Sequence, residues 1–124
     1  MRILQSSEDY LETILQIQQE KGCVRSIDIA HELNFSKASV SIAMKHLREK
    51  EHITVTDVGF ISLTESGRAI AEMIFERHEI LTSALVSLGV PEDIASEDAC
   101  KLEHVISSES FEALKSHFIK HNKI

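Results

Sequence analysis

The chain has 124 residues, a length that suits one compact domain or two small domains sharing a core. It contains only two cysteines, Cys23 and Cys100, which are too few for a disulfide framework and favour a reduced, cytoplasmic location. No apolar run approaches the length of a membrane span, and the first residues lack the apolar core of a signal peptide. We therefore expect neither a disulfide-rich secreted protein nor a membrane protein.

The formal net charge of −7 argues against nonspecific binding of nucleic acid by the whole surface. Residues 65–124 carry 6 basic against 11 acidic side chains, whereas residues 1–64 carry 7 against 9. Within residues 36–50 the balance reverses, because a single acid, Glu49, stands among four basic residues. Nucleic acid would have to bind at this basic segment, which contains Lys37, Lys45, Arg48 and Lys50.

Helical spacing of apolar residues predicts a first helix over residues 6–20, and Gly22 ends it. Acidic side chains in the first turns are favoured by the helix dipole, which explains Glu8 without any further role. Asp9 and Glu12 differ, since their i, i+3 spacing allows both carboxylates to meet one cation.

Residues 26–33 predict a short amphipathic helix, and a third helix follows over residues 37–50 after a turn at Asn34 and Phe35. Two short helices joined by a tight turn, the second opening with hydroxyl and basic side chains, are typical of a helix-turn-helix. On this pattern alone an ordinary helical hairpin stays open as the alternative. The residues that lie off the buried stripe and would contact DNA are Ser36, Lys37, Ser39, Ser41 and Lys45.

Two alternating β-branched runs, residues 52–56 and 60–64, flank a turn at residues 57–59 and predict a β-hairpin. A hairpin directly after a recognition helix is typical of a winged helix, which weakens the alternative of a plain helical hairpin. The turn has the sequence Asp57-Val58-Gly59, without Lys or Arg, so the wing should contribute little to phosphate binding.

Three further helices are predicted in the second half of the chain. A long helix runs from residue 64 to about residue 88, with His78 on its apolar stripe. Pro91 takes the first position of the next helix, which extends to roughly residue 106. Ser107 or Ser108 then caps a last helix, and the chain is expected to fray from residue 120 onward. The apolar face of this last helix consists of Phe111, Leu114 and Phe118.

Cys100, Glu103 and His104 stand at positions i, i+3 and i+4, which share one face of a helix. Thiolate, carboxylate and imidazole are all metal ligands, but three ligands are too few to close a coordination shell. Taken in isolation, the triple would be better explained as a solvated helix face with a half-buried cysteine. Candidates for the missing ligands are Asp9, Glu12 and His78.

The order of these parts resembles the diphtheria-toxin-repressor family of metal-dependent transcriptional repressors, in the short form that includes the manganese transport regulators. The resemblance covers nearly the whole chain and keeps the order and spacing of the matching segments. The chain ends where longer members append an SH3-like domain, so that domain is expected to be absent. The matching segments are Glu8-Asp9-Tyr10-Leu11-Glu12, Asp28-Ile29-Ala30, Ser39-Val40-Ser41, residues 63–67, Arg77-His78-Glu79 and residues 100–107.

The resemblance implies a mainly α fold in which a winged helix-turn-helix DNA-binding domain, residues 1–64, precedes a helical metal-binding and dimerisation domain, residues 65–124. It also implies that one or two divalent metals bind to Asp9, Glu12, His78, Cys100, Glu103 and His104.

The implied ligand set is mixed between two types of family member. Asp9 matches the manganese type and Cys100 the iron type, while Thr82 and Ser96 stand where the iron type has ancillary ligands. Oxygen-rich ligation suits Mn(II) and Fe(II), whereas thiolate with imidazole favours Fe(II), Co(II) or Zn(II). We therefore expect Mn(II) or Fe(II), followed by Zn(II) or Co(II).

In the implied mechanism the metal holds the first helix against the helices behind the DNA-binding unit and fixes the angle between two recognition helices. A homodimer would then bind a palindromic operator in double-stranded DNA and repress metal-homeostasis genes. The dimer interface would include Ile106, Phe111, Leu114 and Phe118.

Two other classes stay open from the residues themselves. One is a metal-independent winged-helix regulator of the MarR type, with Cys100 as a redox sensor. The other is a small metallohydrolase with Glu103 as base, although no nucleophile motif supports it and the winged helix would have no role. Cys23 is expected to pack behind the first helix, and the surface histidines are His31, His46, His52, His117 and His121.

Overall fold

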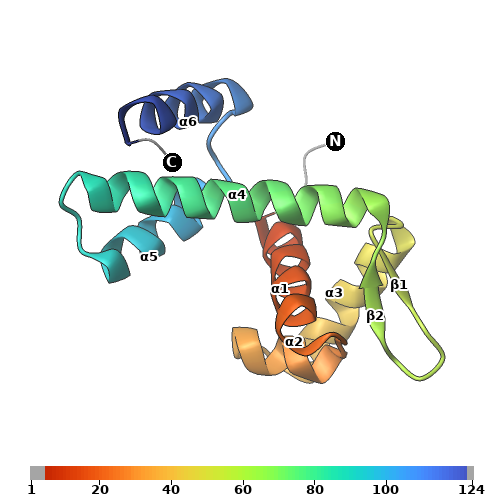
Figure 1. Cartoon of the computed structure of the whole chain (residues 1–124). Coiled ribbons are helices and arrows are strands. Elements are labelled where there is room, and N and C mark those ends of the chain that lie inside the picture. Colours follow the sequence, from red (N-terminus) through yellow and green to blue (C-terminus); the bar gives the residue numbers. More distant parts are fainter. Residues whose placement is uncertain (1–4, 123–124) are drawn as a thin grey trace. The chain divides into compact units, whose positions relative to one another are not determined.

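The computed structural model describes residues 5–122 and contains, in that range, six helices and a two-stranded sheet (Figure 1). The mainly α fold predicted from the sequence is confirmed. The chain divides into two compact units, Met1–Glu72 and Met73–Ile124, and α4 (Glu65–Ser87) contributes to both. The proposed domain boundary after residue 64 stays a prediction. Of the helices in the described range, none has the length and apolar character needed to cross a membrane.

Helix α1 (Gln5–Lys21) buries an apolar stripe at helical spacing, with Leu11, Ile14 and Leu15 nearly inaccessible to solvent. Gly22 ends the helix with φ +85°, a conformation that side chains rarely tolerate, and its N–H donates to the carbonyl of Gln18 at 2.8 Å. The predicted first helix is thus confirmed to within a residue or two.

The helix-turn-helix consists of α2 (Ser26–Leu33) and α3 (Lys37–Glu49), as the sequence predicts. Asn34 closes α2 in the left-handed conformation, with φ 56°, and makes the turn tight. The Ser36 hydroxyl then accepts the backbone N–H of Ser39 at 3.1 Å and caps α3.

Strands β1 (Ile53–Val55) and β2 (Ile61–Leu63) pair antiparallel, with Ile53 opposite Leu63. Each strand is one residue shorter at both ends than its predicted run. The N–H of Gly59, at φ +90°, donates to the Thr56 carbonyl at 2.9 Å and forms the wing tip.

The base of the wing lies against the start of α4. The Thr64 hydroxyl donates to the Glu51 carbonyl at 2.7 Å, and the Thr64 N–H donates to the His52 carbonyl at 3.0 Å. A Cβ on Gly67 would overlap the backbone carbonyl of His52, so only glycine permits this close approach.

In the second unit, α4 packs with α5 (Glu92–Leu102) and α6 (Ser108–Asn122) around a small apolar cluster. Leu81, Ala99 and Phe111 form its buried part, and Ile80 and Ile106 pack against it. The N–H of Ser110 donates to the Ser107 hydroxyl at 3.0 Å, which confirms the predicted cap of the last helix.

Several local predictions are wrong. Helix α5 starts at Glu92, with Pro91 outside it as the cap residue, and ends at Leu102 instead of near residue 106. Helix α6 continues to Asn122 where fraying was expected, while Lys123 and Ile124 lie outside the described residues. Cys23 is exposed and does not pack behind α1.

Candidate metal centre

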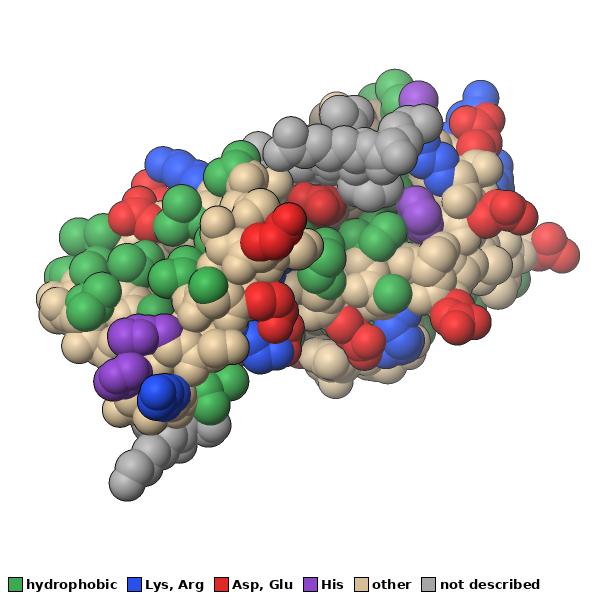
Figure 2. Space-filling model, turned by 90° about the horizontal axis from the view of Figure 1, so that it is seen from above, with side chains coloured by type: hydrophobic (Ala, Val, Ile, Leu, Met, Phe, Trp, Pro, Cys, Tyr) green, Lys and Arg blue, Asp and Glu red, His purple; other side chains and the backbone are tan. Residues whose placement is uncertain are grey.

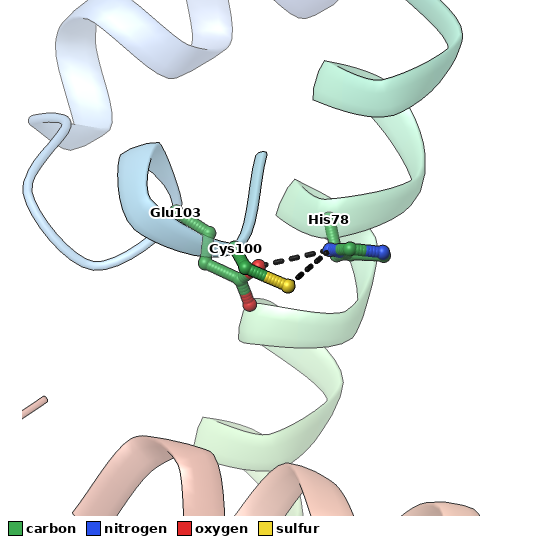
Figure 3. A group of neighbouring side chains, drawn as sticks. All are labelled: His78, Cys100 and Glu103. Atoms are coloured by element: carbon green, nitrogen blue, oxygen red, sulfur yellow. Dashed lines mark hydrogen bonds and ion pairs between the residues drawn. The ribbon is translucent and has the colours of Figure 1, made fainter. Parts of the chain in front are cut away.

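Three side chains from two helices and the turn after them form a cluster of metal-ligand atoms in the second unit (Figure 3). Their ligand atoms all lie within 4.8 Å of one another. His78 on α4 places Nδ1 3.0 Å from Oε1 of Glu103 and 3.8 Å from Sγ of Cys100. One nitrogen, one sulfur and one carboxylate oxygen directed at a common point are a donor set that fits a divalent transition-metal ion.

The three ligands differ in their access to solvent. The side chain of Glu103 is 1% exposed, that of His78 is 21% exposed, and Cys100 lies open at the surface. A buried carboxylate is costly unless positive charge or hydrogen bonds compensate it. The contact with His78 supplies one such hydrogen bond, and a bound cation would supply charge compensation as well.

Ser96 contacts the ring nitrogen of His78 that points away from the cluster. Its Oγ lies 3.4 Å from Nε2 of His78, one helical turn before Cys100 on α5. When the Nε2–H donates to this hydroxyl, the lone pair of Nδ1 is available to a metal. Ser96, which stands where the family resemblance implies an ancillary ligand of the iron type, thus contacts the candidate ligand His78.

The prediction that Cys100, Glu103 and His104 share one helix face is wrong, because α5 ends at Leu102. Glu103 retains helical dihedral angles as the cap residue, so it stays near Cys100, whereas His104 lies in the following turn. The side chain of His104 is 2% exposed, and its Nε2 is 4.0 Å from Oε2 of Glu103.

The acidic pair lies on α1 in the first unit. Asp9 and Glu12 are one helical turn apart and both are half-buried. Burial raises the pKa of the neighbouring Tyr10 hydroxyl, and the negative charge of Asp9 adds to the rise. The participation of Asp9 and Glu12 in a metal site remains a prediction from the sequence.

Arg77 is a functional residue that the sequence analysis missed. Its side chain is 7% exposed, and Nη1 donates to the backbone carbonyls of Glu103 and Ile106, each at 3.0 Å. Nη2 is 3.5 Å from the Ser108 hydroxyl, and the guanidinium lies 5.5 Å from the ring centre of Phe111. This one side chain therefore ties α4 to the ligand-bearing turn and to the start of α6.

A signal for this role exists in the sequence. Arg77 lies three residues after buried Ile74 and four before buried Leu81, so a charged side chain interrupts an apolar helix stripe. A buried arginine must find acceptors, and backbone carbonyls of an irregular turn are the ones it finds here.

The predicted DNA-contacting residues are all exposed, on α3 or at its start, whereas Val40, Met44 and Leu47 of the same helix are buried. The Ser36 and Ser39 hydroxyls are 2.9 Å apart and hydrogen bond to each other. The exposed set is Ser36, Lys37, Ser39, Ser41 and Lys45.

The four predicted interface residues differ in accessibility. Phe111 and Phe118 are buried within the protomer, Ile106 is half-buried, and Leu114 is 46% exposed. Figure 2 shows hydrophobic side chains gathered over the end of the molecule that carries α6. The exposed large apolar residues at the end of α5, in the turn that follows and on α6 are Leu102, Val105, Leu114 and Ile119.

Comparisons with known proteins give a family match for each of the two parts of the chain. Residues 2–57 match the family description "Iron dependent repressor, N-terminal DNA binding domain", and residues 64–123 match "Iron dependent repressor, metal binding and dimerisation domain". An uncharacterized HTH-type transcriptional regulator of Methanocaldococcus jannaschii is 38% identical over 90% of each chain. The transcriptional regulator MntR of Escherichia coli is 33% identical over 92% of this chain and 74% of MntR.

Two solved structures extend the comparison. The IdeR structure from T. acidophilum matches with a TM-score of 0.78 and 28% identity, over 95% of this chain and 55% of IdeR. A manganese-dependent transcriptional repressor in complex with manganese matches with a TM-score of 0.81 and 27% identity, over 90% of this chain and 51% of the other. The chain thus spans about half the length of these two proteins.

A winged helix followed by a helical unit with a cluster of metal ligands defines a metal-dependent DNA-binding transcriptional regulator, and not an enzyme. The family descriptions that match the two parts of the chain identify the protein family. The protein belongs to the iron-dependent repressor family, that of the diphtheria toxin repressor, with an N-terminal DNA-binding domain and a C-terminal metal-binding and dimerisation domain.

Proposed function

We propose that this protein is a homodimeric repressor of metal-homeostasis genes that binds a palindromic operator when Fe(II) or Mn(II) is bound. The observation that carries the proposal is the convergence of His78, Cys100 and Glu103, with all ligand atoms within 4.8 Å. We further propose that it acts in the cytoplasm, because access to DNA and a reduced Cys100 thiol both require such a compartment.

The full ligand set that we propose adds three residues to this cluster. His104 is supported by its buried position near Glu103, and Asp9 and Glu12 by their i, i+3 spacing on α1 and by the family pattern. Four of the six donors are oxygen or sulfur anions, which would repel one another without a cation. The proposed ligands are Asp9, Glu12, His78, Cys100, Glu103 and His104.

A bound divalent cation would supply the positive charge that allows these anionic side chains to stay ionised together. The ligand residues of α4 and α5 would then be joined to those of α1, which leads into the helix-turn-helix. In a dimer this connection would fix the separation and angle of the two α3 helices, so that they fit successive major grooves. Without the cation, we expect a wider range of angles and weaker binding to the operator.

DNA binding of the full chain across Mn(II), Fe(II), Co(II) and Zn(II) tests the proposed function. The probe is the DNA upstream of the protein's own gene, and anaerobic conditions keep Fe(II) and Cys100 reduced. We expect Fe(II) or Mn(II) to strengthen binding at least tenfold over the metal-free protein. Equal binding with and without metal would overturn the metal-dependent repressor, and activation by Zn(II) alone would overturn the choice of metal.

The two cysteines provide a matched pair for testing the ligand assignment, since both are exposed thiols outside any disulfide. Co(II) is a suitable probe, because a thiolate ligand gives it an intense near-ultraviolet absorption band. We expect the band in the unmodified chain and in Cys23→Ser, and its loss in Cys100→Ser. A band that persists in Cys100→Ser would overturn the role of Cys100 as a ligand.

A further inference from the structure

Ile42 is a large aliphatic residue exposed in the middle of the recognition helix. It lies in the second turn of α3, and 61% of its surface is accessible to solvent. At about 100° per residue, Ile42 lies about 160° around the helix axis from both Val40 and Met44, which are buried. It therefore occupies the face directly opposite the protein core.

The same outward face suits close approach to another molecule. Ala38 precedes Ile42 by one turn, so a small side chain lies beside the large one toward the start of the helix. Lys45 lies about 60° around the helix axis from Ile42 and supplies positive charge beside this face, while Lys37 lies at the start of α3 and Glu49 at its end. The surroundings of Ile42 are thus basic and accessible on the part of α3 that would enter a DNA groove first.

An exposed side chain of this size keeps apolar surface that a partner in the groove could bury with a gain in free energy. The major groove of DNA offers one apolar group on the base edges, the C5-methyl group of thymine. Hydrogen-bonding edges of guanine, cytosine and adenine would instead be left unsatisfied by an isoleucine.

We propose that Ile42 packs against a thymine methyl group in the major groove and makes that position of the operator specific for thymine. The inference deepens the proposed function, because it rests on α3 being the helix that contacts base edges. Ser36, Lys37, Ser39, Ser41 and Lys45 would then supply hydroxyl and charged contacts around a hydrophobic one at Ile42.

The expected size of the effect follows from the burial of a single methyl group. About 0.8 kcal/mol per buried carbon corresponds to about a fourfold change in affinity. In a two-fold symmetric complex both protomers make the contact, so removing both methyl groups should weaken binding about 15-fold if the two contributions add.

Replacement of thymine by uracil deletes this methyl group and leaves every hydrogen-bonding group in place. The probe is a duplex selected from random-sequence DNA by the full chain with Fe(II) or Mn(II), followed by single thymine-to-uracil replacements along one half-site. We expect one position, or two adjacent ones, at which uracil weakens binding about fourfold. For Ile42→Ala, we expect thymine and uracil at that position to bind equally within a factor of two.

Val58→Ala provides a matched control, because Val58 is also apolar and 61% exposed but lies at the wing tip. This variant should keep the full preference for thymine over uracil. The inference is overturned if no uracil replacement weakens binding, if the selected site has no thymine, or if Ile42→Ala keeps the preference. If one of these results is obtained and DNA binding still depends on metal, the proposed function stands. If DNA binding does not depend on metal, both the proposed function and the inference about Ile42 are overturned.

Discussion

Arg77 donates a hydrogen bond to the backbone carbonyl of Glu103 at 3.0 Å, so a buried cation holds the main chain of a proposed metal ligand. The second bond from the same nitrogen, to Ile106, closes the other end of the turn. Arg77 is therefore a positioning residue for the cluster, because its two hydrogen bonds stabilise the backbone conformation of the turn that carries Glu103.

Arg77→Lys should distinguish the effect of the hydrogen bonds of Arg77 from the effect of its positive charge. Lysine keeps the positive charge, but its side chain is one bond shorter and has no second nitrogen for the Ser108 hydroxyl, so we expect the free energy of unfolding of the metal-free protein to fall by about 2 kcal/mol. Affinity for Co(II) should fall by about 10- to 100-fold, as for other residues that orient metal ligands.

The control is Arg68→Lys, an exposed arginine on the same helix that makes a 3.7 Å ion pair with Glu72. It should change neither quantity by more than experimental error. Unfolding by denaturant and Co(II) absorption titrations measure the two effects. An Arg77→Lys variant with unchanged Co(II) affinity would contradict the positioning role.

Ser96→Ala should weaken metal binding with little effect on the fold. The hydroxyl lies 3.4 Å from Nε2 of His78, and its loss removes the contact that holds Nδ1 toward the cluster. We expect about a tenfold loss of Co(II) affinity, at the low end for an orienting residue because the contact is long. Ser83→Ala, a half-buried serine on α4, is the control and should titrate like the unmodified chain.

Leu114→Lys should disrupt the homodimer. Leu114 is 46% exposed on α6 beside other exposed apolar residues, and burying a charge in an apolar interface is unfavourable. Sedimentation velocity should show a shift toward monomer at micromolar concentration while circular dichroism stays unchanged. Ile27→Lys, a 43% exposed isoleucine on α2, should remain dimeric, and a dimeric Leu114→Lys would disprove this interface.

Gly67→Ala should destabilise the protein through a backbone clash. The added methyl group would overlap the carbonyl of His52 at the base of the wing, and neither backbone segment can yield easily. We expect a loss of about 2 kcal/mol in thermal or denaturant unfolding. Ala69→Ser, an exposed position on the same helix, should stay within about 0.5 kcal/mol, and a Gly67→Ala variant as stable as that would contradict the close approach.

Asp28 should make the stability of the protein depend on pH in the acid range. Its carboxylate accepts the Arg25 N–H at 2.9 Å and pairs with Lys21 at 3.3 Å, and these contacts lower its pKa. A lowered pKa means that the stabilisation is fully present above the pKa of the unfolded chain, about pH 4, and is lost as the pH falls below that value.

Asp28→Asn should therefore be less stable at neutral pH, by about 1 kcal/mol, and the difference should shrink between about pH 5 and pH 2. Asp57→Asn at the exposed wing tip is the control and should follow the pH profile of the unmodified chain. A constant difference between Asp28→Asn and the unmodified chain would refute the linkage.

Local signals explain why the winged helix could be predicted closely. The cap of α3 needs only Ser36 and the N–H three residues later, and the end of α1 needs only Gly22, so both are encoded within one turn. The end of α5 is different, because the carbonyls of Glu103 and Ile106 are bound by Arg77, which lies 26 residues or more away. A contact between residues so far apart in the chain produces no periodic pattern in the amino-acid sequence from which it could be predicted.

The metal cluster could be predicted only in part, because local spacing indicates which neighbouring residues lie together but not which distant residues join them. Cys100 and Glu103 are three residues apart and could be paired by spacing, whereas His78 could be given only as a candidate, because no local spacing places it beside them. Ser96 was noted as a missing ligand and not as a support for His78, because its role depends on the ring orientation. Ile42 went unnoticed, since exposure of an aliphatic residue becomes informative only once the helix face is known.

The tip of the wing has no basic side chain, and this affects how DNA binding responds to ionic strength. Asp57, Val58 and Gly59 displace no counterions from the phosphate backbone, so the release of salt on binding depends chiefly on the basic side chains of α3. Each such contact contributes about −0.9 to the slope of log affinity against log salt concentration. The salt dependence of operator binding should therefore become shallower in Lys37→Ala or Lys45→Ala and stay unchanged when residues of the wing tip are replaced by alanine.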